Sequence, residues 1–322
     1  GNADILLLDS FRNLLNVKAA LHAVFKVCSE RQELVPVMVS GEIAEAGAGT
    51  LAGLTARALQ HTVSSFPVFS IGLSAGENAS DLHDLLKEIE NAPVRMSVMV
   101  DVSLEGMKPH DSDSVKGRAK ELWRYADSGL VNIVGGGKET TPESLKFMVK
   151  ALKGSRPRRI PARRYNMLLS GLAPMTVAGA GNCICVGNVF NREESPEFAK
   201  IFGEGNLADA VALGHRQVTY GAEILDVNLD SYDTEPPQIQ AFMGKMLDDK
   251  SLAKCPVMMD SRSWDLLIAG IECISGKGIA RSISLSEGEE IFLTKAMEIR
   301  KRGFALVCFA EYENGTSDTF AR

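Results

Sequence analysis

The stretch that decides the fold runs from Gly221 to Ser284 and reads GAEILDVNLDSYDTEPPQIQAFMGKMLDDKSLAKCPVMMDSRSWDLLIAGIECISGKGIARSIS. Three segments within it, residues 222–230, 256–261 and 276–284, begin with an apolar run, end in polar residues and precede a segment that can be helical. Parallel strands that are buried on both faces are nearly all apolar. In βα barrels, ligand-binding groups lie on the loops that follow the strands. The stretch therefore predicts a parallel α/β fold with polar groups at the strand ends.

Polar side chains lie where each of these strands would leave the core. Asp226 and Asn228 alternate with apolar residues and so project from one face of their strand. A neighbouring acid and amide can recognise a heterocycle that carries both hydrogen-bond donors and acceptors. Asp260 and Ser261 have an alternative role as the N-cap of the helix that begins near Trp264.

Composition limits the class of protein. The chain has 322 residues, 45% of them hydrophobic, and a formal net charge of −6. This length predicts two domains, and the mild acidity gives no reason to expect nucleic-acid binding. No segment has the apolar length of a membrane span and no signal-peptide pattern opens the chain, so we expect a cytoplasmic protein with reduced cysteines. The strand-like opening at residues 4–9 indicates a piece of a longer protein.

Strand and helix patterns alternate in both halves of the chain. Residues 153–165 are rich in Pro and Arg and lack hydrophobic periodicity, which is typical of an extended, solvated linker. A full eightfold barrel takes about 250 residues, so two complete barrels do not fit. We predict an α/β fold of two TIM-barrel-type partial barrels, residues 1–152 and 166–322, joined by that linker. Neither would be closed by its own strands, so we expect self-association or internal pairing of the exposed edges.

Other local features carry weaker predictions. Ser10 is predicted to cap the first helix, and Thr141 with Pro142 to begin the helix after residue 140. The run GGGK at 135–138 could hold a phosphate, but a tight turn is the preferred interpretation because the P-loop spacing is absent. Cys183 and Cys185 stand two apart on an expected strand at 182–187, without further zinc ligands nearby.

Ten short motifs follow one another along nearly the whole chain: DILLLD (4–9), VSG (39–41), TLAG (50–53), NIVGG (132–136), TTP (140–142), SGLAP (170–174), MDS (259–261), WD (264–265), GKGI (276–279) and SIS (282–284). This ordered series resembles the cobalamin-dependent methionine synthase family. The resemblance implies the later part of a homocysteine-binding barrel joined to the first half of a methyltetrahydrofolate-binding barrel. It also implies methyl transfer from methyltetrahydrofolate, through cobalamin, to homocysteine, with cobalamin held by a downstream domain or a partner protein.

The chain departs from the family at the zinc site. The family holds zinc with three cysteines, in loops of the form GLNCA and GGCCGTTP. Here Ala75 stands at the first cysteine position, and Gly137 and Lys138 stand at the other two. Zinc lowers the pKa of the homocysteine thiol, and we expect this chain to lack both the metal and that activation.

The pterin-binding pattern of the family is better retained. By resemblance, Asn228 and Asp260 are the leading pterin contacts, and methyltetrahydrofolate is the expected ligand. The family's GERTN loop keeps only Gly187 and Asn191, its Asn before Ser-Ile-Ser is Arg281, and Tyr312 replaces an acid. Lys138 and Arg281 could change the ligand preference. The candidate pterin residues are Asp226, Asn228, Asp230, Asp260 and Asn191, with Asp9 as a homocysteine-side candidate.

Three functions remain open from the sequence. The first is a methionine-synthase-like methyltransferase segment that retains folate binding and has lost homocysteine activation. The second is a degenerate, non-catalytic paralogue or fragment. The third is a binding or interaction module that uses the surfaces of the partial barrels.

Overall fold

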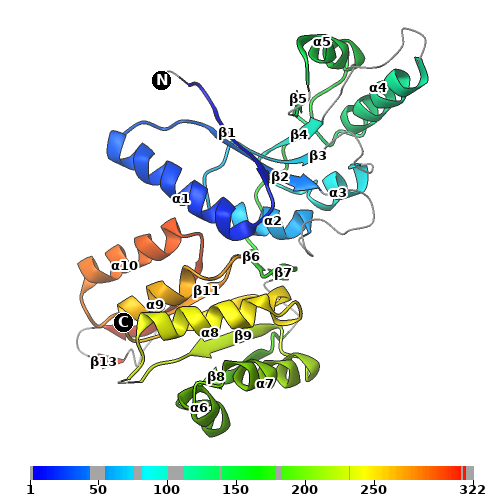
Figure 1. Cartoon of the computed structure of the whole chain (residues 1–322). Helices are drawn as coiled ribbons and strands as arrows, with labels where there is room; N and C mark the ends of the chain where they lie inside the picture. The colour runs from blue at the N-terminus through cyan, green and yellow to red at the C-terminus, as the bar shows by residue number, and fades with distance from the viewer. Residues whose placement is uncertain are drawn as a thin grey trace. The chain divides into compact units, whose positions relative to one another are not determined.

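The computed structural model (Figure 1) describes residues 3–43, 55–75, 82–100, 112–137, 140–178, 183–231, 233–312 and 315–316. The chain forms two compact units. The first consists of Gly1–Gln60 and Pro67–Tyr165, and the second of His61–Phe66 and Asn166–Arg322. Within the described part of the chain, no helix has the length and hydropathy needed to cross a membrane.

The first unit is built on an open parallel sheet whose strands pair in sequence order. Sequential order is what an arc of a βα barrel requires, because each helix crosses over to the very next strand. The strands are β1 (Leu6–Phe11), β2 (Val37–Ile43), β3 (Ser70–Ala75), β4 (Arg95–Val100) and β5 (Ile133–Gly136). The helices are α1 (Leu14–Arg31), α2 (Ala56–Val63), α3 (His83–Glu88), α4 (Ser112–Asp127) and α5 (Pro142–Ala151).

The second unit repeats this design with a second sheet in the order β13-β12-β11-β10-β9-β8. All its described strand pairs are parallel except β12 with β13. Its strands are β8 (Val186–Asn191), β9 (Ile224–Asn228), β10 (Val257–Asp260), β11 (Ile279–Leu285), β12 (Ala305–Tyr312) and β13 (Gly315–Thr316). Its helices are α6 (Pro196–Gly203), α7 (Leu207–Thr219), α8 (Pro236–Asp248), the short 3-10 helix η2 (Leu252–Lys254), α9 (Trp264–Ile271) and α10 (Glu289–Lys301). The predicted α/β class with two partial barrels is confirmed.

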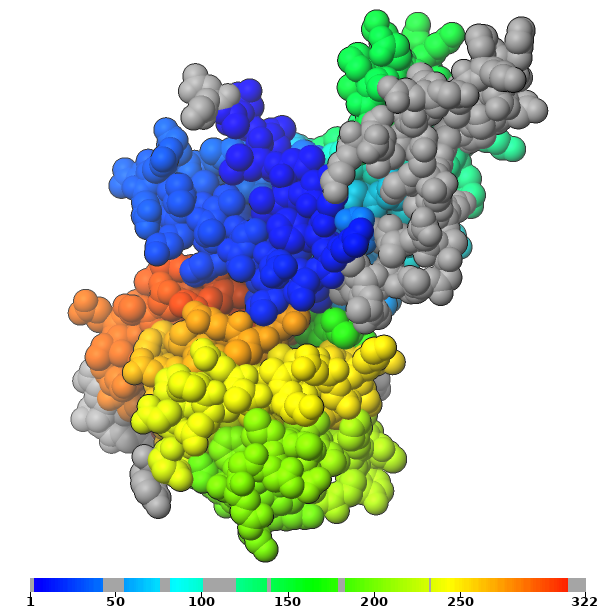
Figure 2. Space-filling model, in the orientation of Figure 1, coloured from blue at the N-terminus to red at the C-terminus, as the bar shows by residue number. Residues whose placement is uncertain are grey.

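Alternate residues of the second sheet face two different environments. One face packs against the helices, where Leu225, Val227 and Met259 join the main core. Helices α7, α8 and α9 pack side by side over this face, and Figure 2 shows the side chains of α7 and α8 as a continuous surface. The core is centred on four aromatic rings with centroids 5.2–5.7 Å apart: Phe190, Phe198, Phe202 and Phe242.

The opposite face, called the inner face here, carries a smaller apolar layer. Ile224, Met258 and Ile279 project from it and pack against Leu169. Leu169 belongs to an antiparallel hairpin that the sequence did not predict, β6 (Met167–Ser170) with β7 (Pro174–Val177). The hairpin therefore covers the part of the inner face that lies before the carboxyl ends of the strands.

Glycines allow the hairpin to approach the sheet closely. A Cβ at Gly276 would overlap the carbonyl oxygen of Ser170, and a Cβ at Gly278 would overlap that of Val257. Backbone packing thus requires both glycines of the GKG motif. Similarly, a Cβ at Gly136 would overlap the side chain of Thr140, which favours the tight-turn interpretation of residues 135–138. Lys138 itself lies outside the described residues.

Several local predictions need correction. Thr141 caps α5 as predicted, but α1 is capped by Asn13 rather than Ser10, which lies within β1. Ser263 caps α9, so Asp260 and Ser261 do not have that role. The strand expected at 182–187 begins only at Val186, and Cys183 and Cys185 are exposed outside it.

The predicted linker is not a free tether throughout. Arg158 is buried, and its guanidinium donates to the carbonyl oxygens of Val94 at 3.0 Å and Ala92 at 2.7 Å, and also to that of Glu90. The backbone N–H of Arg158 donates to the carbonyl oxygen of Val131. The expectation of a solvated linker is therefore wrong at this position, because one arginine satisfies several loop carbonyls that would otherwise be unpaired.

Candidate functional site

A row of polar side chains crosses the inner face where the strands end. The register aligns Asn191 of β8 with Asn228 of β9, Asn228 with Asp260 of β10, and Asp260 with Arg281 of β11. The apolar layer formed with the hairpin lies towards the other end of the same strands. The sheet thus places two amides, a carboxylate and a guanidinium above an apolar floor.

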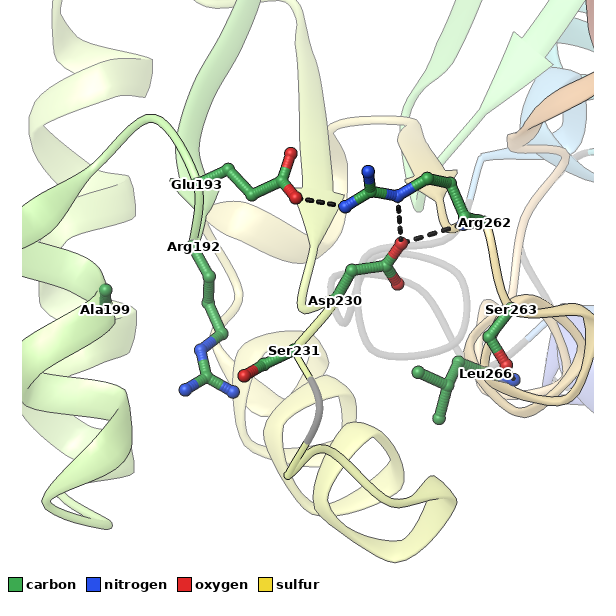
Figure 3. A pocket seen from close by; sticks show the side chains of 8 residues that line it. All are labelled: Arg192, Glu193, Ala199, Asp230, Ser231, Arg262, Ser263 and Leu266. Atoms are coloured by element: carbon green, nitrogen blue, oxygen red, sulfur yellow. Dashed lines mark hydrogen bonds and ion pairs between the residues drawn. The ribbon is translucent and has the colours of Figure 1, made fainter.

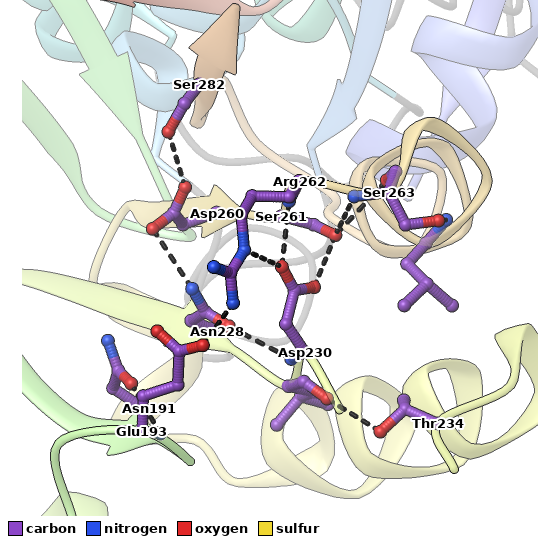
Figure 4. A network of polar contacts seen from close by, with 12 residues as sticks. Asn191, Glu193, Asn228, Asp230, Thr234, Asp260, Ser261, Arg262, Ser263 and Ser282 are labelled. Atoms are coloured by element: carbon purple, nitrogen blue, oxygen red, sulfur yellow. Dashed lines mark hydrogen bonds and ion pairs between the residues drawn. The ribbon is translucent and has the colours of Figure 1, made fainter. Parts of the chain in front are cut away.

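Asp260 is the centre of this row (Figure 4). Its Oδ1 accepts a hydrogen bond from Ser282 Oγ at 2.7 Å, and its Oδ2 accepts one from Asn228 Nδ2 at 3.2 Å. Arg281 Nη1 lies 3.6 Å from the same Oδ2. Asp260 is 8% exposed, so these groups hold a buried carboxylate in one orientation.

Asp226 lies on the same face of β9 as Asn228, two residues nearer the start of the strand. It is paired in register with Met258, and Met258 with Ile279, so its strand neighbours are apolar. Its Oδ2 lies 3.8 Å from Arg281 Nη1, whereas Oδ1 is buried without a hydrogen-bond partner among the described residues. Burial raises the pKa of Asp226 to about 6; the charge of Asp260 adds to the rise and that of Arg281 opposes it. Asp226 therefore changes charge close to neutral pH.

Asp230 lies apart from this row, in the loop after β9. Its Oδ1 accepts from Ser261 Oγ at 2.5 Å and its Oδ2 from the backbone N–H of Arg262 at 2.8 Å. The backbone N–H of Asp230 donates in turn to Asn228 Oδ1 at 2.9 Å. Asp230 thus fastens the loops after β9 and β10 to each other.

An open pocket of about 580 Å³ adjoins Asp230 (Figure 3). Its two arginines are already paired within the described residues. Arg262 contacts Glu193 and Asp230, and Arg192 donates to Thr234 Oγ1 at 2.7 Å. The remaining lining residues are Ala199, Ser231, Ser263 and Leu266.

Asn191 also has a structural role. Its Oδ1 accepts from the backbone N–H groups of Glu193 at 2.9 Å and Glu194 at 3.1 Å, which shapes the turn before α6. The structure therefore brings Asp226, Asn228 and Asp260 together with Arg281, and gives Asp230 and Asn191 loop-fastening contacts instead. Ser282 was missed as a site residue, although it belongs to the SIS motif (282–284) and lies in the middle of β11.

In the first unit, the residues at the family's zinc positions do not fit a zinc ion. Ala75 is the buried last residue of β3 and Gly137 follows β5, and neither offers a ligand. Among the described residues, no group of three or more His, Cys, Asp or Glu side chains could hold a metal ion. Asp9 lies in β1, and its Oδ1 is buried without a hydrogen-bond partner in the described part of the chain.

Two protein-family models match this chain, one in each half. Residues 1–152 match the family model of homocysteine S-methyltransferase, and residues 187–319 match that of pterin binding enzymes. The carboxyl transferase domain of Rhizobium etli pyruvate carboxylase, solved with pyruvate, has 12% identity to this chain and a TM-score of 0.25. That match covers 94% of this chain but only 49% of the other, so this chain spans about half its length, and likeness at this level carries no functional argument. Residues 1–152 are thus similar to homocysteine S-methyltransferase domains and residues 187–319 to pterin-binding domains, a combination that methionine synthase-like proteins also contain.

Proposed function

We propose that the second unit binds the pterin ring of a reduced folate, such as methyltetrahydrofolate, on the inner face. The observation that carries the proposal is the cluster of Asn228, Asp260 and Asp226, which lies within the region matched by the pterin-binding family model. Asp230 and Asn191 support the loops around this cluster. The proposed functional domains are residues 1–152 and 166–322, joined by 153–165.

The chemistry of the cluster suits a pterin. The ring edge presents an exocyclic amine, a ring N–H and a carbonyl in a row. A carboxylate can accept two neighbouring N–H groups together, and an amide can donate or accept beside it. Removing one partner of a buried charged hydrogen bond costs about 1.5–3 kcal/mol, which is roughly tenfold to a hundredfold in affinity.

We further propose that the chain acts as a methyltransferase segment. A methyl group would pass from methyltetrahydrofolate, through cobalamin held by another domain or protein, to homocysteine. The matched homocysteine S-methyltransferase domain supports the last step, and the absence of thiolates at Ala75 and Gly137 weakens it. Without a metal to lower the thiol pKa, little homocysteine thiolate forms near neutral pH.

The loss of the zinc-binding thiolates favours a second candidate function. In it, the chain is a non-catalytic paralogue whose second unit binds a pterin without transferring a methyl group. The two candidates separate in one assay. Purified protein is incubated with methyltetrahydrofolate and chemically reduced cobalamin, and the formation of tetrahydrofolate is followed. Production that falls at least tenfold in Asp260→Ala supports methyl transfer at the inner face. Binding of methyltetrahydrofolate without production supports the non-catalytic paralogue.

A further inference from the structure

The surroundings of Arg281 are unusual for a guanidinium between two carboxylates. Its Nη1 lies 3.6 Å from Asp260 Oδ2 and 3.8 Å from Asp226 Oδ2, and both distances are too long for hydrogen bonds. Its Cζ lies 5.5 Å from the centroid of the Phe309 ring. Arg281 donates no hydrogen bond to the described residues, although a guanidinium has five N–H donors. The group is held in place by charge and by an aromatic ring, and its donors remain available.

The neighbouring acceptors are also incompletely used. Asp226 is 3% exposed, and its Oδ1 has no hydrogen-bond partner among the described residues. The side chain of Arg281 is 32% exposed, so a ligand that reaches the inner face can contact it. The buried carboxylate of Asp226 can thus accept hydrogen bonds beside the accessible guanidinium of Arg281, which can donate them. This pair is complementary to a ligand edge that carries donors next to an acceptor.

We propose that Arg281 determines which pteridine ring the site accepts, by donating to the oxygen at position 4 while Asp226 and Asp260 accept the 2-amino and N3 hydrogens. The inference rests on the proposed pterin-binding function and adds a selectivity to it. It follows that a 4-oxo ring is favoured over a 4-amino ring.

The reason is the direction of one hydrogen bond. A 4-amino group would turn its own donors toward the guanidinium, so neither group would find an acceptor. A 2,4-diaminopteridine is also the more basic ring, and its protonated form would be repelled by Arg281. A site built to bond one polar group discriminates strongly against an analogue that leaves that group unpaired.

Removing the guanidinium should reverse the preference. With Arg281→Met, two carboxylates remain close together without their cation, and they attract a basic ring. With Arg281→Lys, the positive charge remains but the planar fork is lost. The lysine variant should therefore still reject the diamino ring, although with a smaller ratio.

The test is calorimetric titration with two probes that differ only at position 4, 6,7-dimethylpterin and 2,4-diamino-6,7-dimethylpteridine. The unmodified protein is expected to bind the 4-oxo probe roughly tenfold to a hundredfold more tightly. Arg281→Met is expected to bind the diamino probe more tightly than the 4-oxo probe. Arg216→Met on α7, which removes an exposed ion pair with Glu197 of α6, is the matched control and should keep the original ratio.

The possible outcomes test the role of Arg281 in selectivity separately from the proposed pterin binding. Equal affinity for the two probes, or an unchanged ratio in Arg281→Met, would overturn the role of Arg281 and leave pterin binding standing. Failure of the unmodified protein to bind either probe would overturn the proposed function and this inference with it. Arg281→Lys protects the test against misfolding of the methionine variant, since it keeps a cation between the carboxylates.

Discussion

The raised pKa of Asp226 makes a quantitative prediction about stability. The pKa rises from an ordinary value of 3.8 to about 6 in the folded chain. A difference of about 2 pKa units corresponds to roughly 3 kcal/mol. Because the folded state favours the neutral acid, its extra stability is complete below about pH 4 and is lost as pH rises through about 6. At pH 7.5 the folded protein therefore holds a buried charge at a cost.

Replacing that charge should stabilise the second unit. Asp226→Asn stays neutral at every pH, so we expect it to raise the free energy of unfolding at pH 7.5 by about 1–3 kcal/mol, less any cost of the new amide donors. At pH 4 the gain should vanish, because the wild-type carboxyl is then protonated as well. Asp265→Asn, at an exposed carboxylate in the first turn of α9, should instead cost a few tenths of a kcal/mol without a step near pH 6.

The assay needs a signal from the second unit alone. The chain has two tryptophans, Trp123 in α4 of the first unit and Trp264 in α9 of the second. Urea unfolding of a Trp123→Phe background, followed by fluorescence at pH 4 and pH 7.5, reports on the unit that contains Asp226. A stability difference that is the same at both pH values, or a variant that is less stable at pH 7.5, would refute the reasoning.

Three further predictions concern metal and packing. Because Ala75 and Gly137 offer no ligand, elemental analysis of protein purified without chelator should find no stoichiometric zinc in the first unit; about one tightly held zinc per chain would contradict this. Gly276→Ala should destabilise the second unit by more than about 2 kcal/mol, because the new Cβ would overlap backbone atoms. Gly244→Ala, in open space on α8, should instead stabilise the unit by about 0.5–1 kcal/mol. A similar effect of both substitutions in urea unfolding would refute the packing argument. Phe242→Ala should cost about 3–5 kcal/mol, since the ring is fully buried among three others; a loss below 1 kcal/mol would mean that the aromatic core is not formed as described.

The fold was largely predictable because hydrophobic patterns dictate it. Buried parallel strands need continuous apolar runs, and those around Leu225 and Met259 were recognisable without any structure. The β6–β7 hairpin was not predicted, since its strands are short and its partners, Ile224 and Met258, lie far away in the sequence. The anchoring of Arg158 was also missed, because composition does not show which carbonyl oxygens need a donor.

The candidate site was predictable only in part. Alternation placed Asp226 and Asn228 on one face, and the strand-end rule added Asp260. These rules did not reveal that Asp230 accepts hydrogen bonds from a hydroxyl group and a backbone N–H of the neighbouring loop. The sequence showed Arg281 as a departure from the family, but its approach to two carboxylates depends on the register between β10 and β11, which spacing along the chain does not give.

The most direct test of the central claim is calorimetric titration of the chain with methyltetrahydrofolate, beside the variants Asp260→Ala and Asp265→Asn. The account predicts binding by the unmodified chain and by Asp265→Asn, and a loss of roughly tenfold to a hundredfold in Asp260→Ala, because Asn228, Ser282 and Arg281 all converge on that carboxylate. Undetectable binding by the unmodified chain at millimolar ligand, or equal affinity in Asp260→Ala, would contradict it.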